Sequence, residues 1–273
     1  MPWATNPIFD PGNNTEKAAA NVEAGPAGAR QHDGGHDGSV SGSATPELKN
    51  SDDLKFRQPS DRFTPHQIFY IFILDGIVSA IVAGGINFAI AYALYHNRGT
   101  EQSPIRLFQF PNTLAGDTVV TIFIQFLTTW VIESVLVNWD LRNGAVQPIG
   151  FIPEPRWRAV RWFMFLDRHE QTHEVSSIKH WLRFLLSQVI RSLVLAVVFF
   201  PLIFGASVGF LTIFGTRHDQ DWDWYYSAKW APEIFKLVQG ALLGLLFTPL
   251  MVMFWLTRCG WALRTKEEQS AEP

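Results

Sequence analysis

Long apolar stretches separated by polar connections make up most of the chain after residue 64. Each is about as long as the roughly 20 residues that an α-helix needs to cross the hydrocarbon core of a bilayer. The apolar stretches occupy residues 67–95, 118–139, 184–215 and 236–257. This pattern predicts an all-α fold: a polytopic membrane protein with four transmembrane helices in one domain over residues 65–262, followed by a short cytosolic tail over 263–273.

The first quarter of the chain has a different composition. Residues 1–64 are rich in Gly, Ala, Asn, Ser, Asp and Pro. A segment of this kind buries too little apolar surface to offset the entropy of the chain, so we expect a disordered tail. The first residues show neither the basic region nor the apolar core of a cleavable signal peptide, so the first span is expected to act as the targeting signal.

Basic residues are unevenly distributed among the segments outside the spans. Lys and Arg number six in the N-terminal tail, seven in the second loop (residues 140–183) and three from Arg258 to the C-terminus, against two each in the first and third loops. The positive-inside rule therefore predicts that both termini and the second loop face the cytosol. The expected location is the endomembrane system or the plasma membrane.

The loops carry their own signals. In the second loop Trp162, Phe165 and Leu166 share one face at helical spacing, which predicts an interfacial helix lying along the membrane. The arginines around them suit anionic lipid headgroups, which are the expected partner of this loop. In the first loop, Asp117 is the expected N-cap of the second span.

Small residues recur every four positions in three of the spans, where they allow helices to approach closely in lipid. They are Gly76, Ala80 and Gly84 in the first span, Gly205 and Gly209 in the third, and Gly240 and Gly244 in the fourth. The first span is therefore expected to be the central packing element. Whether the other faces act within one bundle, between copies of the chain or with another membrane protein stays open.

Three charged residues fall within the first three spans: Asp75, Glu133 and Arg191. At 1.5 Å per residue all three would lie roughly 9–12 Å from the cytosolic side, so they could meet. Glu133 must lie within the membrane-embedded part of its span, since the apolar run before it is too short to cross a bilayer alone. The cluster, with its polar neighbours Gln125 and Gln188, either pairs to assemble the helices or forms an ion or substrate site.

The second loop contains the pattern HExxH over residues 169–173. On a helix His169 and His173 project from one face and can bind zinc, with His180 as a third ligand and Glu170 as a general base. The charged neighbours of the motif are unlike those of a zinc protease. A hydrolase, a non-catalytic zinc site and a solvated helix face are the three interpretations.

Three stretches resemble a family of fungal integral membrane proteins of unknown function: FYIFILDGIVSAIVAGGINFAIAYALY, IRLFQFPNTLAGDTVVTIFIQ and VQPIGFIPEP. The second of them, with its FPNTLAGD segment, is the most specific. The resemblance implies four membrane spans and brings no established chemistry and no functional residues.

Composition narrows the function without selecting one. A net charge of −3 gives no reason to expect nucleic-acid binding, and a single cysteine, Cys259, excludes an intramolecular disulfide. We see no Gly-rich phosphate loop, serine triad or haem motif. The leading hypothesis is a non-enzymatic scaffold, assembly factor or lipid-organising protein. The alternative is a small proton- or cation-linked carrier that uses Glu133, and a metal-dependent hydrolase is third.

Overall fold

The structure, a computed structural model, describes residues 57–97, 104–110, 112–164, 166, 178–218, 220 and 222–271. Four helical segments in this part of the chain are long and apolar enough to cross a membrane. They are Pro65–Tyr95, Leu114–Arg142, Leu182–Phe214 and Ala231–Arg264. The predicted all-α class is confirmed. Most of the predicted disordered tail lies outside the described residues.

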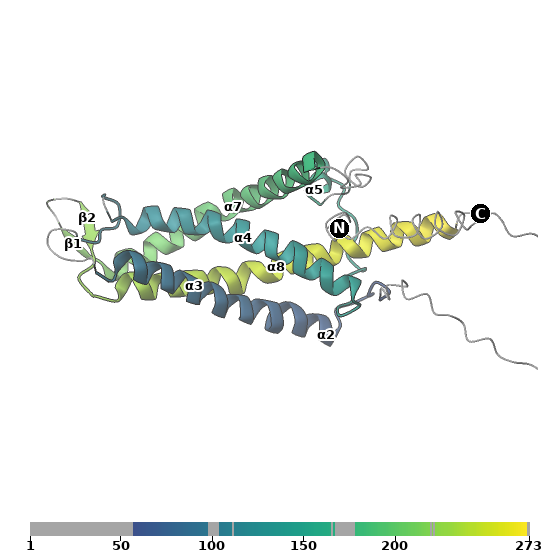
Figure 1. Cartoon of the computed structure of the whole chain (residues 1–273), viewed down its shortest axis with the longest axis horizontal. Helices are drawn as coiled ribbons and strands as arrows, with labels where there is room; N and C mark the ends of the chain where they lie inside the picture. Colours follow the sequence, from purple (N-terminus) through teal and green to yellow (C-terminus); the bar gives the residue numbers. More distant parts are fainter. Residues whose placement is uncertain are drawn as a thin grey trace, which may run out of the picture.

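The four segments run side by side along the long axis of the molecule (Figure 1). The first comprises α2 (Pro65–Ile68), the π-helix η1 (Phe69–Ile77) and α3 (Val78–Tyr95), and the others are α4 (Leu114–Arg142), α7 (Ile178–Phe214) and α8 (Ala231–Ala271). Helix α8 packs against α3, η1 and α4, whereas α7 packs mainly against α4. The central packing element is therefore α8 and not the first span as predicted.

Small residues explain the close approach of α3 and α8. A Cβ atom added at Gly244 would lie 2.7 Å from the Ser79 carbonyl oxygen and 2.9 Å from the Ala80 nitrogen, and one at Gly240 would lie 2.7 Å from the Ala83 oxygen. On the other side of the contact, Gly84 faces Ala241, with an added Cβ at 3.1 Å from its Cβ. Only residues without side-chain bulk fit at these positions.

Of the remaining glycines in the predicted stripes, one lies in a helix contact and two do not. A Cβ at Gly76 would lie 3.1 Å from Pro249 Cγ, so Gly76 also belongs to the contact with α8. A Cβ at Gly205 or Gly209 would meet nothing within 4 Å. The small-residue stripe of α7 therefore lies on an open face of the described bundle.

One end of the bundle is closed by a cap that the sequence analysis did not predict. Strands β1 (Thr216–His218) and β2 (Asp223–Tyr225) form an antiparallel hairpin, and Leu107 of the first loop donates to the Trp224 oxygen at 3.1 Å. The buried Asp223 carboxylate accepts hydrogen bonds from the backbone of Phe108 and Gln109. Two loops that are distant in sequence thus support each other.

Tyr226 and Thr113 make further hydrogen bonds at the hairpin end of the bundle. Burial, and then the nearby Asp223 carboxylate, raise the pKa of Tyr226, so its hydroxyl stays protonated and donates to the Leu211 oxygen at 3.0 Å. The N-cap of α4 is Thr113, whose side chain accepts from the Gly116 nitrogen. The prediction that Asp117 is the N-cap is wrong, because α4 begins at Leu114 and Asp117 lies within its first turn.

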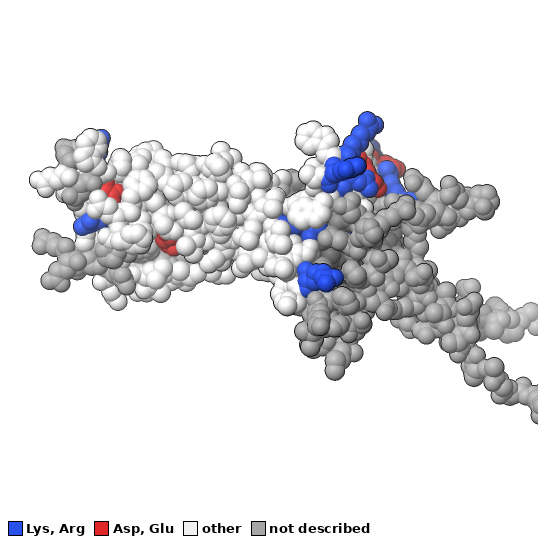
Figure 2. Space-filling model, turned by 90° about the horizontal axis from the view of Figure 1, so that it is seen from above, with Lys and Arg blue, Asp and Glu red and all other residues white. Residues whose placement is uncertain are grey.

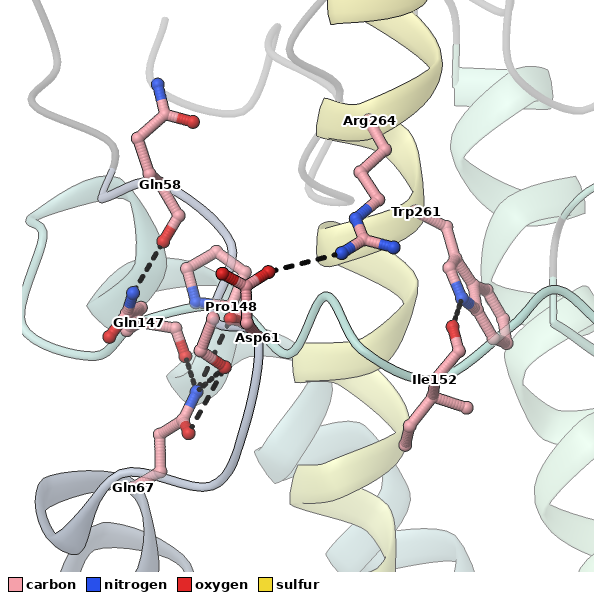
Figure 3. A network of polar contacts seen from close by, with 9 residues as sticks. Gln58, Asp61, Gln67, Gln147, Pro148, Ile152, Trp261 and Arg264 are labelled. Atoms are coloured by element: carbon pink, nitrogen blue, oxygen red, sulfur yellow. Dashed lines mark hydrogen bonds and ion pairs between the residues drawn. The ribbon is translucent and has the colours of Figure 1, made fainter.

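The opposite end joins the second loop to the first and fourth spans (Figure 3). The buried Gln67 side chain donates to the carbonyl oxygens of Gln147 at 2.8 Å and Pro148 at 3.3 Å. Trp261 of α8 donates to the Ile152 oxygen at 2.6 Å. The start of the first span, the second loop and the extension of α8 are therefore tied together.

The described helix of the second loop, α5 (Arg158–Phe163), is only six residues long. It is shorter than predicted, since Phe163 turns inward and packs on Trp130 and Phe254. Figure 2 shows a broad middle of the molecule without Lys or Arg, and the largest group of basic side chains at the end that carries α5. This distribution is compatible with a multi-pass membrane protein.

Candidate functional site

A cleft with a volume of about 440 Å³ lies between the first span and α4. Its lining runs from Leu74 to Ile90 on the first span and from Asp117 to Leu136 on α4. At 1.5 Å per residue these stretches are roughly 24 and 29 Å long. The cleft therefore extends over nearly the roughly 30 Å thickness of a hydrocarbon core.

Polar side chains form a row along each wall of the cleft. On α4 the row contains a polar residue every four positions, which places them on one helix face. Its members are Asp117, Thr121, Gln125, Thr129 and Glu133. On the first span Asp75, Ser79 and Asn87 follow the same spacing, with Ala83 between the last two. We refer to these two sets as the polar rows.

Apolar side chains flank the polar rows on both sides of the opening. On the first span they are Leu74, Val78, Val82, Ile86 and Ile90, and on α4 they are Val120, Ile124, Ile132 and Leu136. Their exposed fractions are 43–58%. In a membrane such residues face lipid tails, so the cleft would open sideways into the bilayer.

The middle of the cleft is connected by hydrogen bonds between neutral groups. The Asn87 amide donates to the Ala83 oxygen at 2.8 Å and to Gln125 Oε1 across the cleft at 3.4 Å. Gln125 in turn donates to the Thr129 hydroxyl at 3.3 Å. Ser79 bonds to Thr248 of α8 at 2.7 Å. Hydrogen bonds thus join the two walls to each other, and a separate one joins the first span to α8.

The end of the cleft near the hairpin holds a paired charge. Lys236 of α8, only 1% exposed, lies 3.2 Å from the Asp117 carboxylate and hydrogen-bonds to Thr121. An ammonium group that leaves water requires such partners. This end of the polar row on α4 is therefore electrically balanced.

The other end holds two acids without a described base. Asp75 is 7% exposed and Glu133 is 5% exposed, and one oxygen of each carboxylate, Oδ2 and Oε2 respectively, has no hydrogen-bond partner. Neither forms an ion pair within the described part of the chain. Asp75 lies in η1, and π-helices occur frequently at functional sites.

The predicted charge cluster is divided between two places. Asp75, Gln125 and Glu133 line the cleft, while Gln188 and Arg191 do not. Gln188 accepts from the Trp130 indole at 2.8 Å. The fully buried Arg191 donates to the Trp162 oxygen at 2.9 Å and lies over the ring of that residue. The expectation that Arg191 meets the two acids is not what the geometry shows, because its guanidinium is directed to the second loop.

The predicted zinc ligands cannot be placed in the cleft or elsewhere. His169 and His173 lie outside the described residues, as does the side chain of His180. Among the residues that the structure does describe, no group of three or more His, Cys, Asp or Glu side chains is arranged to hold a metal ion. Zinc binding stays a prediction.

Comparison with known proteins gives relatives but no activity. Residues 161–256 match a family described as a protein of unknown function, DUF2456. An uncharacterized protein of Schizosaccharomyces pombe is 33% identical over 249 residues, which cover 84% of this chain and 49% of that protein. The chain is similar to fungal proteins of unknown function.

A second relative supports the same conclusion. An uncharacterized protein of Saccharomyces cerevisiae is 26% identical over 250 residues, covering 70% of this chain and 78% of that protein. The chain spans about half the length of the fission-yeast relative. No solved structure matches the chain significantly.

Sequence reasoning missed half of the polar rows. It singled out charged residues and glutamines, and passed over Ser79, Asn87, Thr121 and Thr129. The signal that would have found these four is the four-residue spacing, from Asp75 to Asn87 and from Asp117 to Glu133. Lys236 of α8, beside the rows, was also passed over. A face of this kind within a transmembrane segment indicates contact with something other than lipid tails.

Proposed function

We propose that this protein is a lipid-organising membrane protein that binds a lipid in the cleft and lets its polar end move between the two leaflets. The observation that carries the proposal is the pair of polar rows, which run for roughly 18 Å on the first span and 24 Å on α4 beneath exposed apolar edges. A polar headgroup resists entry into hydrocarbon because its hydrogen bonds with water are lost. The rows would replace those bonds while the tails stay in the bilayer.

The proposed orientation has both termini and the second loop in the cytosol. Supporting it are the basic residues near α5, namely Arg156, Arg158 and Arg161, at the same end as the start of the first span. In this orientation the arginines would contact anionic headgroups of the cytosolic leaflet. The same surface would hold the mouth of the cleft close to its lipid supply.

A proton- or cation-linked carrier is the second candidate. It is favoured by the Glu133 carboxylate, which is buried, lines the cleft and has an oxygen without a partner. An open side toward lipid is less suited to a small hydrated ion than to an amphipathic molecule, because an ion would be exposed to lipid tails along its path. The lipid function is therefore placed first.

The test measures transbilayer movement of fluorescent lipids, one with and one without a phosphate in the headgroup, in vesicles that contain the purified full chain. In the variant Gln125→Leu/Thr129→Val, the middle of the polar row on α4 becomes apolar. Two lost polar contacts of about 1 kcal/mol each should slow the protein-dependent rate about thirtyfold. The matched control is Thr212→Val, because this threonine lies on α7 and bonds only to the Gly209 oxygen of its own helix.

Several results decide between the functions. A rate unchanged by the cleft variant, with the same elution volume and melting temperature as the wild type, would remove the lipid proposal. A proton flux across vesicles that is lost in Glu133→Gln, without lipid movement, would establish the carrier instead. Cross-linking of the cleft to another membrane protein would favour a scaffold.

A further inference from the structure

We infer that the end of the cleft formed by Asp75 and Glu133 binds the ammonium group of a long-chain amine. The inference rests on the proposed lipid-binding function of the cleft and names the class of lipid that this end would select. It depends on three properties of the two acids: each has an oxygen without a described partner, they lie at a common depth, and no base among the described residues lies beside them.

The two carboxylates each have an oxygen that no described residue of the chain partners. Asp75 Oδ2 and Glu133 Oε2 are buried and have no hydrogen-bond partner, and both residues line the cleft. Buried polar atoms are nearly always hydrogen-bonded, so each exception needs an explanation. An ammonium group offers three donors in a compact arrangement, which suits carboxylate oxygens of this kind.

Both acids lie at the same depth from the loop-two end of the bundle. Asp75 is ten residues from Pro65 at the start of the first span, and Glu133 is nine residues from Arg142 at the end of α4. At 1.5 Å per residue, the two depths are about 15 and 14 Å. Glu133 is also within electrostatic reach of both Asp75 and Asp140. A cation bound at this end would therefore be attracted by more than one carboxylate.

The charge on the two ends of the cleft differs. Asp117 has Lys236 at 3.2 Å, while Asp75 and Glu133 have no ion-pair partner in the described chain. No Lys or Arg is among the described residues that line the cleft. In a low-dielectric site an unpaired carboxylate is costly, so a bound cation would stabilise this end most strongly.

The same charge pattern argues against a phosphate in the headgroup. A phosphate beside Asp75 and Glu133 would add negative charge where the lining holds no base to pair with it. An amine attached directly to a long apolar chain avoids this repulsion. Its tail would leave through the side of the cleft, past the half-exposed Val78 and Ile132.

The experiment compares three photoreactive probes on the purified full chain in lipid nanodiscs. All carry the same tail and photoreactive group, and their heads are a primary amine, its neutral N-acetyl derivative and a phosphate monoester. We expect the amine to label peptides of η1, α3 or α4 at least ten times more efficiently than the other probes. In Asp75→Asn/Glu133→Gln, labelling by the amine probe should fall to the level of the neutral probe. In the control Glu154→Gln, which changes an exposed acid, the preference for the amine probe should be unchanged.

Failure of the inference and failure of the proposed function look different. Equal labelling of the cleft by the amine and the neutral probe would overturn the amine inference and leave lipid binding in place. Stronger labelling by the phosphate probe would overturn it as well. If all three probes label only residues outside the cleft, the proposed function falls too. The comparison on the wild type decides even if the double variant does not fold.

Discussion

Buried charges lie on both sides of α4, but only those on one side are fully partnered by described residues. Toward α7, the fully buried Arg191 donates to the carbonyl oxygens of Phe163 and Trp162 and lies over an aromatic ring. Toward the cleft, Asp75 and Glu133 have oxygens without partners. A partnered charge stabilises a particular arrangement of helices, whereas an unpartnered one is retained at a cost in stability. The difference is what the proposal of a ligand in the cleft would explain, with the first face serving assembly.

The largest effect is expected from Arg191→Met. The methionine fills similar space but leaves the Phe163 and Trp162 oxygens without their donor, and it removes the stacking on Trp162. Charge-assisted hydrogen bonds contribute about 1.5–3 kcal/mol each, so the loss should be about 3–5 kcal/mol. Unfolding of the purified protein in detergent, followed by tryptophan fluorescence, measures it.

The control for this prediction is Arg161→Met. Arg161 pairs with Glu154 at 3.2 Å, but both side chains are over a third exposed, so the change should cost at most about 1 kcal/mol. If Arg191→Met were no worse than this control, the face toward α7 would not depend on its buried charge. The claim that a partnered buried charge stabilises the packing of α4 against α7 would then be wrong.

An intermediate effect is expected from Lys236→Met, which would turn the balanced end of the cleft into a second unpaired end. The Asp117 carboxylate loses the ammonium at 3.2 Å but stays 17% exposed, so water replaces part of the interaction. We expect a loss of about 2 kcal/mol, and recovery of most of it in Lys236→Met/Asp117→Asn. A double variant that is as unstable as the single one would show that Lys236 acts through packing alone.

Much of this architecture could be predicted from the sequence, because apolar length and charge distribution are local properties. The four spans and the all-α class follow from runs such as residues 192–216, which contain no charge. The stripe at Gly240 and Gly244 could be recognised as a close contact, but not that its partner is the first span of the same chain. Partner choice depends on the packing of the whole bundle.

The candidate site was only partly predictable. Asp75 and Glu133 could be identified as charges in apolar surroundings, and their equal depth follows from helix geometry. Depth alone also matched Arg191, and nothing in the sequence shows that its side chain turns toward the carbonyls at the end of α5. The angular position of each residue around its helix axis decides whether it faces the cleft or α7. That position is fixed by contacts such as Trp130 with Gln188, which join residues 58 positions apart.

The smallest effect, and the sharpest test of the comparison, is expected from Asp75→Asn/Glu133→Gln measured for stability. Amides keep the shape of the side chains and remove charge that has no described partner, so the variant should equal the wild type or exceed it by up to about 1 kcal/mol. This is opposite in sign to Arg191→Met, although both changes remove buried charge. A loss above about 1 kcal/mol in delipidated protein would mean that the carboxylates are already partnered within the chain. Addition of a long-chain amine should raise the melting temperature of the wild type and not that of the variant, because a ligand stabilises only the form that binds it.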